Sequence, residues 1–122
     1  MQTLNFGKGH MMTTIAGTKK ITLRKYGVEP LDFKKNEIIY GEFKDGLTFL
    51  LKITADTEKK FFNDLTDKEA QEDGFINAKD AFNGLKIYYP DLQLSDILAI
   101  IRYEIATLNN APIVNMNRFH QS

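Results

Sequence analysis

Hydrophobic and polar residues alternate along four stretches of the chain in a way that predicts β-strands. These stretches are residues 20–24, 37–43, 47–55 and 97–105, and apolar side chains recur in them with the period of about two residues that a strand imposes. The second and third stretches are separated by "KDG" at 44–46, a short turn sequence typical of a β-hairpin. The pattern therefore predicts at least four strands, two of them joined as a hairpin.

Three other segments have the spacing of short helices. Residues 10–16 place apolar side chains on one face, and residues 67–73 and 78–88 are expected to form two further helices. Thr66 and Glu69 fit a capping box, in which each side chain accepts a hydrogen bond from the backbone amide of the other residue. The first helix is expected to end at a glycine and the last before a proline.

This order of elements predicts an α+β domain. Short strands with non-helical connections favour a small, mostly antiparallel, curled sheet with helices packed beside it. Residues 58–65 can extend that sheet. The domain is expected to cover residues 1–105, and the tail at 106–122, which has no clear period, is expected to be partly mobile.

Composition narrows the possible function classes. The chain has 122 residues, no cysteine and no net formal charge, so a disulfide framework, a thiolate zinc site and strong bulk attraction to nucleic acid are not predicted. His10, expected on a helix face, and His120 lie at opposite ends of the chain without metal-ligand spacing, so neither a metal nor a cofactor is expected. The absence of a long apolar run or a signal peptide makes a cytoplasmic protein the expectation.

The stretch "AGTKKITLR" at 16–24 combines a strand pattern with unusual polar content. Ile21 and Leu23 alternate with polar residues that include Thr22 and Arg24. One interpretation is an edge strand with a solvated basic face. The other is a strand whose polar face lines a cleft and contacts a ligand.

The residue types left for catalysis are lysine, threonine and the acids. A threonine hydroxyl needs a base to become a nucleophile, and a lysine can serve if burial or neighbouring cations depress its pKa. Lys19, Lys20 and Arg24 are crowded together beside Thr22, which favours such a depression. The alternative is a basic strand in which Thr22 serves only as a good β-former.

Three motifs give the chain a resemblance to ASCH domains, the activating-signal-cointegrator homology family related to PUA-type RNA-binding barrels. They are "MMTTIAGTKKITLR" at 11–24, "LTDKEAQEDGF" at 65–75 and "LAIIRYEI" at 98–105, and the resemblance spans roughly residues 4–105. It implies a small PUA-like β-barrel with helices across its openings. It also implies a cleft that accepts a nucleoside or RNA.

One bacterial branch of that family, of similar length, hydrolyses 4-acetylcytidine with a lysine, a threonine and a glutamate and without a metal. By position these residues correspond to Lys19, Thr22 and Asp73. The resemblance thus implies that Thr22 attacks the acyl carbonyl, Lys19 takes its proton, and Asp73 orients the lysine or passes the proton to the leaving amine. Asp73 departs from the family's glutamate and is one methylene shorter, while the adjacent Glu72 points in a different direction along a helix.

Strand alternation and alignment disagree about the lysine. Alternation places Lys20 beside Thr22, whereas the alignment favours Lys19, which would then lie in the turn before the strand. A non-catalytic RNA- or nucleotide-binding module remains the alternative function. In that case the cations would contact phosphate, and Tyr26, Tyr40 or Phe75 would stack on a base. The residues expected to contact a substrate are Lys20, Arg24, Glu72 and Phe75.

Overall fold

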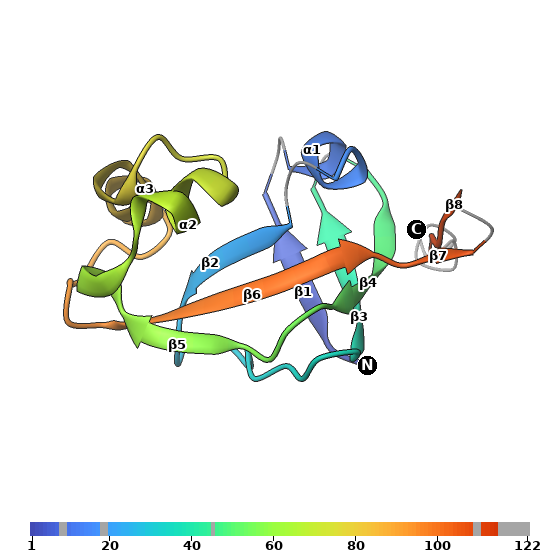
Figure 1. The fold of residues 1–122 in the computed structure, drawn as a ribbon, viewed down its shortest axis with the longest axis horizontal. Coiled ribbons are helices and arrows are strands. Elements are labelled where there is room, and N and C mark those ends of the chain that lie inside the picture. Colours follow the sequence, from blue (N-terminus) through green and yellow to red (C-terminus); the bar gives the residue numbers. More distant parts are fainter. Residues whose placement is uncertain (8–9, 18–19, 45, 109–110, 115–122) are drawn as a thin grey trace.

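The computed structural model describes residues 1–7, 10–17, 20–44, 46–108 and 111–114 and shows the expected α+β architecture (Figure 1). The strands are β1 (Thr3–Phe6), β2 (Ile21–Lys25), β3 (Ile38–Phe43), β4 (Thr48–Ile53), β5 (Glu58–Phe61), β6 (Ile97–Ile105), β7 (Thr107–Leu108) and β8 (Ala111–Pro112). The helices are α1 (Met11–Ile15), α2 (Asp67–Glu72) and α3 (Ala78–Leu85), with one 3₁₀ turn, η1 (Phe62–Asp64).

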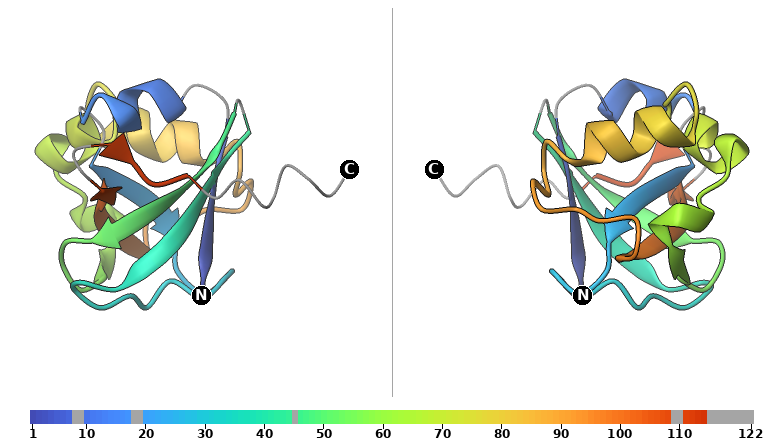
Figure 2. Two further views of the ribbon diagram at one scale, coloured as in Figure 1. Left: turned by 90° about the vertical axis from the view of Figure 1, so that its right-hand side faces the viewer. Right: turned by 90° about the vertical axis from the view of Figure 1, so that its left-hand side faces the viewer.

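The main sheet has six strands and is strongly curled (Figures 1 and 2). Five of them follow the order β1-β3-β4-β6-β2, and β5 pairs with the remaining part of β6. The pairings are antiparallel except that of β1 with β3, which is parallel. The predicted curled and mostly antiparallel sheet is therefore confirmed.

The sheet is an incomplete barrel. Its order begins at β1 and ends at β2, and among the described residues no strand pairing joins these two strands. A side-chain contact crosses the opening instead, because the Arg24 guanidinium of β2 donates to the backbone carbonyl of Asn5 in β1, with Nη2 and O 2.7 Å apart. We call this opening between β1 and β2 the seam.

Strand β6 is buried on both faces and separates two hydrophobic cores. Ala99, Ile101 and Tyr103 belong to the core inside the half-barrel. Leu98 and Ile100 point the other way, into a core closed by α2 and α3. A strand covered on both sides has a nearly continuous apolar sequence, as residues 97–105 do.

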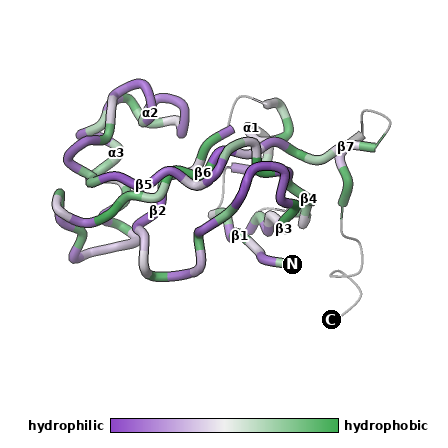
Figure 3. The backbone as a smooth tube through the Cα atoms, turned by 60° about the horizontal axis from the view of Figure 1, so that its bottom comes forward, coloured by the Kyte–Doolittle hydropathy of each residue, from purple (hydrophilic) through white to green (hydrophobic). Residues whose placement is uncertain are grey.

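The helices cover one end of the curled sheet (Figure 2). The capping box at the start of α2 is present, because the Thr66 hydroxyl accepts from the Glu69 amide and the Glu69 carboxylate accepts from the Thr66 amide. The segment carrying α2 is mostly hydrophilic (Figure 3). Helix α3 ends at Leu85, earlier than predicted, since the residues leading to Pro90 leave the helical conformation.

Two elements near the chain ends lay outside the sequence prediction. Strand β1 has only four residues, too few for alternation to identify it, and its partner β3 is remote in sequence. After β6 the chain forms the small β7–β8 hairpin. Residue Val114 then bridges Phe49 of β4, so the described end of the chain packs on the main sheet.

Candidate functional site

A cavity of about 140 Å³ lies at the seam, beneath the turn that follows α3. Its walls come from β1, β2, the C-terminal end of α2 and the end of α3. The lining residues are Asn5, Phe6, Gly7, His10, Thr22, Leu23, Arg24, Asp73, Leu85, Tyr88 and Tyr89. We call this space the seam cavity.

Thr22 faces the seam cavity because of the alternation along β2. Ile21 and Leu23 are buried in the core under α2 and α3, so Thr22 and Arg24 point to the opposite face. The Thr22 side chain is largely buried, at 6% exposure, yet it lines the cavity. The interpretation of this strand as the wall of a cleft, rather than a solvated edge, agrees with its placement.

Arg24 is held by three acceptors at once. Its Nη1 donates to Glu29 Oε1 at 3.2 Å, its Nη2 donates to the Asn5 carbonyl oxygen at 2.7 Å, and its Nε donates to Thr22 Oγ1 at 3.3 Å. The guanidinium carbon also lies 5.1 Å from the centre of the Phe6 ring, a cation–π distance. Arg24 is therefore a rigid part of the wall with its charge paired by Glu29.

Asp73 reaches the cavity from the end of α2. Its Oδ2 accepts from the backbone amide of Leu23 at 3.3 Å, which joins the two sequence motifs at the cavity wall. The position of Asp73 is set by a Schellman turn, in which Gly74 N donates to Gln71 O and Phe75 N donates to Ala70 O. Gly74 adopts φ +97° in this turn, a conformation that favours glycine.

Two tyrosines after α3 complete the mouth of the cavity. Burial raises the pKa of the Tyr89 phenol, and the Arg24 charge and the backbone amide of Lys25 offset part of that rise. Tyr88 is 68% exposed, and a methyl group built on Gly7 would lie 3.4 Å from its hydroxyl. The Tyr88 side chain thus reaches from α3 toward the end of β1.

The other residues expected at the site have different positions. Lys19, the expected base, lies outside the described residues. Lys20 is exposed and borders a different cavity, beside Ile15 and Glu104. Glu72 is exposed and is not part of the seam cavity wall. Phe75 is partly buried and packs against the core under α2 and α3, where a methyl group on Gly84 would lie 2.7 Å from its Cε1.

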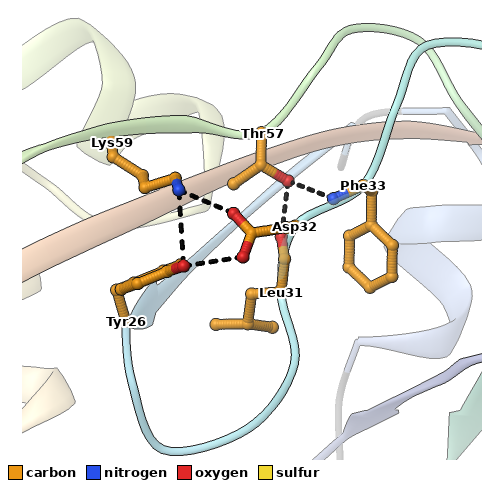
Figure 4. A network of polar contacts seen from close by, with 6 residues as sticks. All are labelled: Tyr26, Leu31, Asp32, Phe33, Thr57 and Lys59. Carbon is orange, nitrogen blue, oxygen red and sulfur yellow. Dashed lines mark hydrogen bonds and ion pairs between the residues drawn. The ribbon is translucent and has the colours of Figure 1, made fainter.

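The aromatic residues proposed for base stacking are also engaged elsewhere. The Tyr26 hydroxyl donates to Asp32 Oδ2 at 2.6 Å, and Lys59 binds the same carboxylate at 2.7 Å (Figure 4). Hydrogen bonds to Lys59 and Tyr26 lower the pKa of Asp32. This network ties the loop after β2 to β5, and neither Tyr26 nor Tyr40 lines the seam cavity.

Sequence reasoning missed His10, Phe6 and the two tyrosines as cavity residues. His10 lines the seam cavity, and its ring centre lies 6.5 Å from that of Phe6. No local pattern marks it, because its position depends on β1 pairing with the distant β3. The adjacent pair Tyr88 and Tyr89, next to Pro90, was the one available signal, since a helix that stops there can present aromatic side chains in its final turn.

Two kinds of feature are absent from the described residues. No three histidine, aspartate or glutamate side chains among them gather as metal ligands would. No helix within the described ranges is long and apolar enough to cross a membrane.

Comparison with known proteins places the fold. No family model and no curated protein sequence matches the chain. Among solved structures, an ASCH domain from Lactobacillus crispatus JV V101 superposes with a TM-score of 0.63 and 11% identity, over 76% of this chain and 67% of that one. The protein has the fold of an ASCH domain.

Two further structures share this ASCH-like fold. Protein EF3133 from Enterococcus faecalis V583, described by the family model DUF984, has a TM-score of 0.59 and 13% identity, over 86% of this chain and 71% of that one. The hypothetical protein PH0355 has a TM-score of 0.55 and 23% identity, over 85% and 98% of the two chains. At such identities the likeness concerns the fold, and the function must be argued from the seam cavity itself.

Proposed function

We propose that the seam cavity binds a nucleoside and that the protein hydrolyses the amide of an acylated nucleoside such as 4-acetylcytidine. The observation that carries this proposal is the hydrogen bond between Asp73 Oδ2 and the amide of Leu23. It brings the acid of one motif beside the Thr22 hydroxyl and the Arg24 guanidinium of the other, at the wall of one cavity. The resemblance to the hydrolase branch of ASCH domains assigns Thr22 and Asp73, together with Lys19, to catalysis.

The charges around the cavity favour a neutral ligand over a phosphate-bearing one. Arg24 is the one cation among its described lining residues, and Glu29 pairs with it at 3.2 Å. Asp73 adds a negative charge, so a phosphate would meet more acid than base here. A nucleoside satisfies these charges, whereas an RNA backbone calls for unpaired cations.

The chemical steps follow from the residue types. The Thr22 oxygen attacks the acyl carbon, and its proton passes to the uncharged amine of Lys19. The C–N bond then breaks, its electron pair goes to nitrogen, and that nitrogen takes up a proton. Water finally adds to the acyl carbon of the threonine ester, which releases the acid and restores the Thr22 hydroxyl. The Arg24 Nε that already donates to Thr22 Oγ1 supplies positive charge beside the reacting oxygen.

Turnover with defined variants tests the proposal. We expect deacylation of 4-acetylcytidine by the wild-type protein, with chelator present throughout, and none by Thr22→Ala. Lys19→Arg should be nearly as damaging as Lys19→Ala, because a guanidinium cannot act as a base near neutral pH. Thr54→Ala is the matched control, since Thr54 lies outside the seam cavity. Full activity of Thr22→Ala would exclude Thr22 as the nucleophile.

The alternative function, a non-catalytic RNA- or nucleotide-binding module, is favoured by one observation. Ile87 and Tyr88 are 79% and 68% exposed beside the mouth of the cavity, where an aromatic ring could stack on a base. Salt dependence distinguishes the two functions. Binding through phosphates weakens steeply as salt rises, whereas binding of a neutral nucleoside should change little. Salt-sensitive RNA binding without deacylation would support the module and contradict the hydrolase.

A further inference from the structure

The hydrolase chemistry leaves open which group protonates the departing nitrogen, a role for which the resemblance offers Asp73 as one of two alternatives. An amide nitrogen is a poor leaving group unless it receives a proton as the C–N bond breaks. The donor must line the cavity and must be able to give up a proton near neutral pH.

Most polar residues of the cavity wall do not fit that role. Arg24 is permanently charged and engaged with three acceptors. Aspartate carboxyls ordinarily lose their proton well below neutral pH, and Asp73 Oδ2 already accepts from the Leu23 amide. Phenols ordinarily ionise near pH 10, and burial raises the pKa of Tyr89 further. Tyr88 projects largely into solvent.

His10 meets both requirements. It lines the same cavity as Thr22 and Asp73, and an imidazole ordinarily exchanges its proton near pH 6.5. Its ring lies beside that of Phe6, with centres 6.5 Å apart and planes inclined by 55°. Phe6 is itself stacked on Phe43 at 4.5 Å, so it offers the imidazole a fixed wall.

We propose that His10 is the proton donor for the leaving nitrogen, a role that rests on the proposed hydrolase function. The imidazolium gives its proton to nitrogen while the C–N electron pair moves to that nitrogen. Water then attacks the acyl group on Thr22. One proton of the water returns to His10, its hydroxide adds to the acyl carbon, and the Thr22 oxygen leaves with the proton held by Lys19. Each step conserves protons and charge.

The test compares two substrates with different leaving groups. 4-Acetylcytidine releases an amine that needs a proton, whereas 4-nitrophenyl acetate releases a phenolate that does not. We expect His10→Gln to lower kcat/KM on 4-acetylcytidine by about 100-fold or more and to leave the rate of the acylation burst with 4-nitrophenyl acetate, which precedes the deacylation step that both substrates share, within about threefold of wild type. The profile of kcat/KM against pH on 4-acetylcytidine should also lose one ionisation. His120→Gln, which alters the other histidine of the chain, is the control.

Each other outcome has a defined meaning. Equal losses on both substrates, in His10→Gln and His10→Asn alike with unchanged thermal unfolding midpoints, would show a structural role and overturn the proposal. Unchanged activity on both substrates would overturn it as well. A wild-type protein that binds nucleosides but does not hydrolyse them would contradict the hydrolase function and this role together. A wild-type hydrolase whose His10→Gln variant keeps full activity would contradict the role alone.

Discussion

The Asp73 carboxylate accepts a hydrogen bond from the backbone amide of Leu23, with Oδ2 and N 3.3 Å apart. The two residues are fifty positions apart in sequence. The Leu23 amide points away from β6, because Tyr26 N donates to Ile97 O and Tyr103 N donates to Lys20 O, so the intervening odd-numbered amides face outward. Asp73 therefore satisfies an unpaired amide of the strand edge and places a carboxylate at the seam cavity.

The turn that orients Asp73 can be tested with two glycines. Gly74 and Gly27 have φ values of +97° and +96°, and a methyl group on either would meet no atom within 4 Å. An alanine at each position should cost about 1–2 kcal/mol of folding free energy through backbone strain alone. Only Gly74→Ala should also weaken nucleoside binding, because only that turn positions Asp73. Urea unfolding and calorimetric titration of the two variants measure both effects, and equal binding losses would contradict the link.

Patterns that depend on neighbouring residues were readable in the sequence. The capping box at Thr66 and the apolar run of β6 need only local spacing, and both appear as predicted. Asp73 was named through the resemblance to ASCH domains, and it lies at the wall of the seam cavity. By contrast, β1 pairs in parallel with a strand more than thirty residues away, which no short window can show.

The misassigned residues were those whose role depends on tertiary packing. Phe75 follows an acidic turn, as a ligand-contacting aromatic could, but the missing side chain at Gly84 opens a space that its ring fills. His10 carried no spacing signal, and it reaches the seam cavity because β1 ends beside β2 across the seam. Neither the packing of Phe75 beside Gly84 nor the position of His10 at the seam cavity can be predicted from residues that are neighbours in the sequence.

The position of Phe75 in the core predicts a separation of stability from binding. Phe75→Leu keeps an apolar side chain but shortens the contact with Gly84 and its neighbours, so we expect a loss of about 1–2 kcal/mol in unfolding free energy. Nucleoside affinity of the folded protein should stay within about twofold. Tyr88→Leu is the matched comparison, since it should weaken binding with little change in stability. A large loss of nucleoside affinity in Phe75→Leu would indicate that Phe75 contacts the ligand.

Acid sensitivity should depend on Glu69. Burial alone would raise its pKa, but hydrogen bonds from Lys60 and Thr66 outweigh burial and hold the pKa below its ordinary value; the Lys60 Nζ to Glu69 Oε1 distance is 2.8 Å. A carboxyl group whose pKa is lower in the folded state stabilises the fold at pH values above its unfolded-state pKa. That contribution to stability is lost as the pH falls through the folded-state pKa. The free energy of unfolding should thus fall as pH drops below the ordinary glutamate value of 4.5, and Glu69→Gln should flatten that fall. An unchanged slope in the variant would refute the assignment.

Ionisation of Tyr103 should reduce the free energy of unfolding at alkaline pH. Burial raises the pKa of its phenol to about 12, and its hydroxyl makes no hydrogen bond of good geometry within the described residues, although Thr14 lies nearby. Because the pKa of this phenol is higher in the folded state, its contribution to stability is fully present below the unfolded-state pKa of about 10. That contribution is lost as the pH rises toward 12. Tyr103→Phe should be neutral or stabilising at pH 7, because it removes a buried unpaired hydroxyl. A loss above about 1 kcal/mol in urea unfolding would show that the hydroxyl is paired.

Arg24 should be irreplaceable by lysine. Its guanidinium spans the seam to Asn5 while it also donates to Thr22 and Glu29, and a lysine ammonium cannot reach three acceptors arranged around a planar fork. We expect Arg24→Lys to reduce both stability and nucleoside binding nearly as much as Arg24→Gln does. Glu29→Gln removes one contact and leaves the bridge across the seam intact, so it should retain most binding. If the wall needed only a positive charge at this place, Arg24→Lys would bind nucleoside like wild type, and the proposed geometric role of the Arg24–Asn5 contact across the seam would be wrong.

Phe6 should support the same contact, because its ring centre lies 5.1 Å from the Arg24 guanidinium carbon. Phe6→Leu should therefore weaken nucleoside binding, and a double-mutant cycle with Arg24→Lys would detect the shared role as non-additive losses.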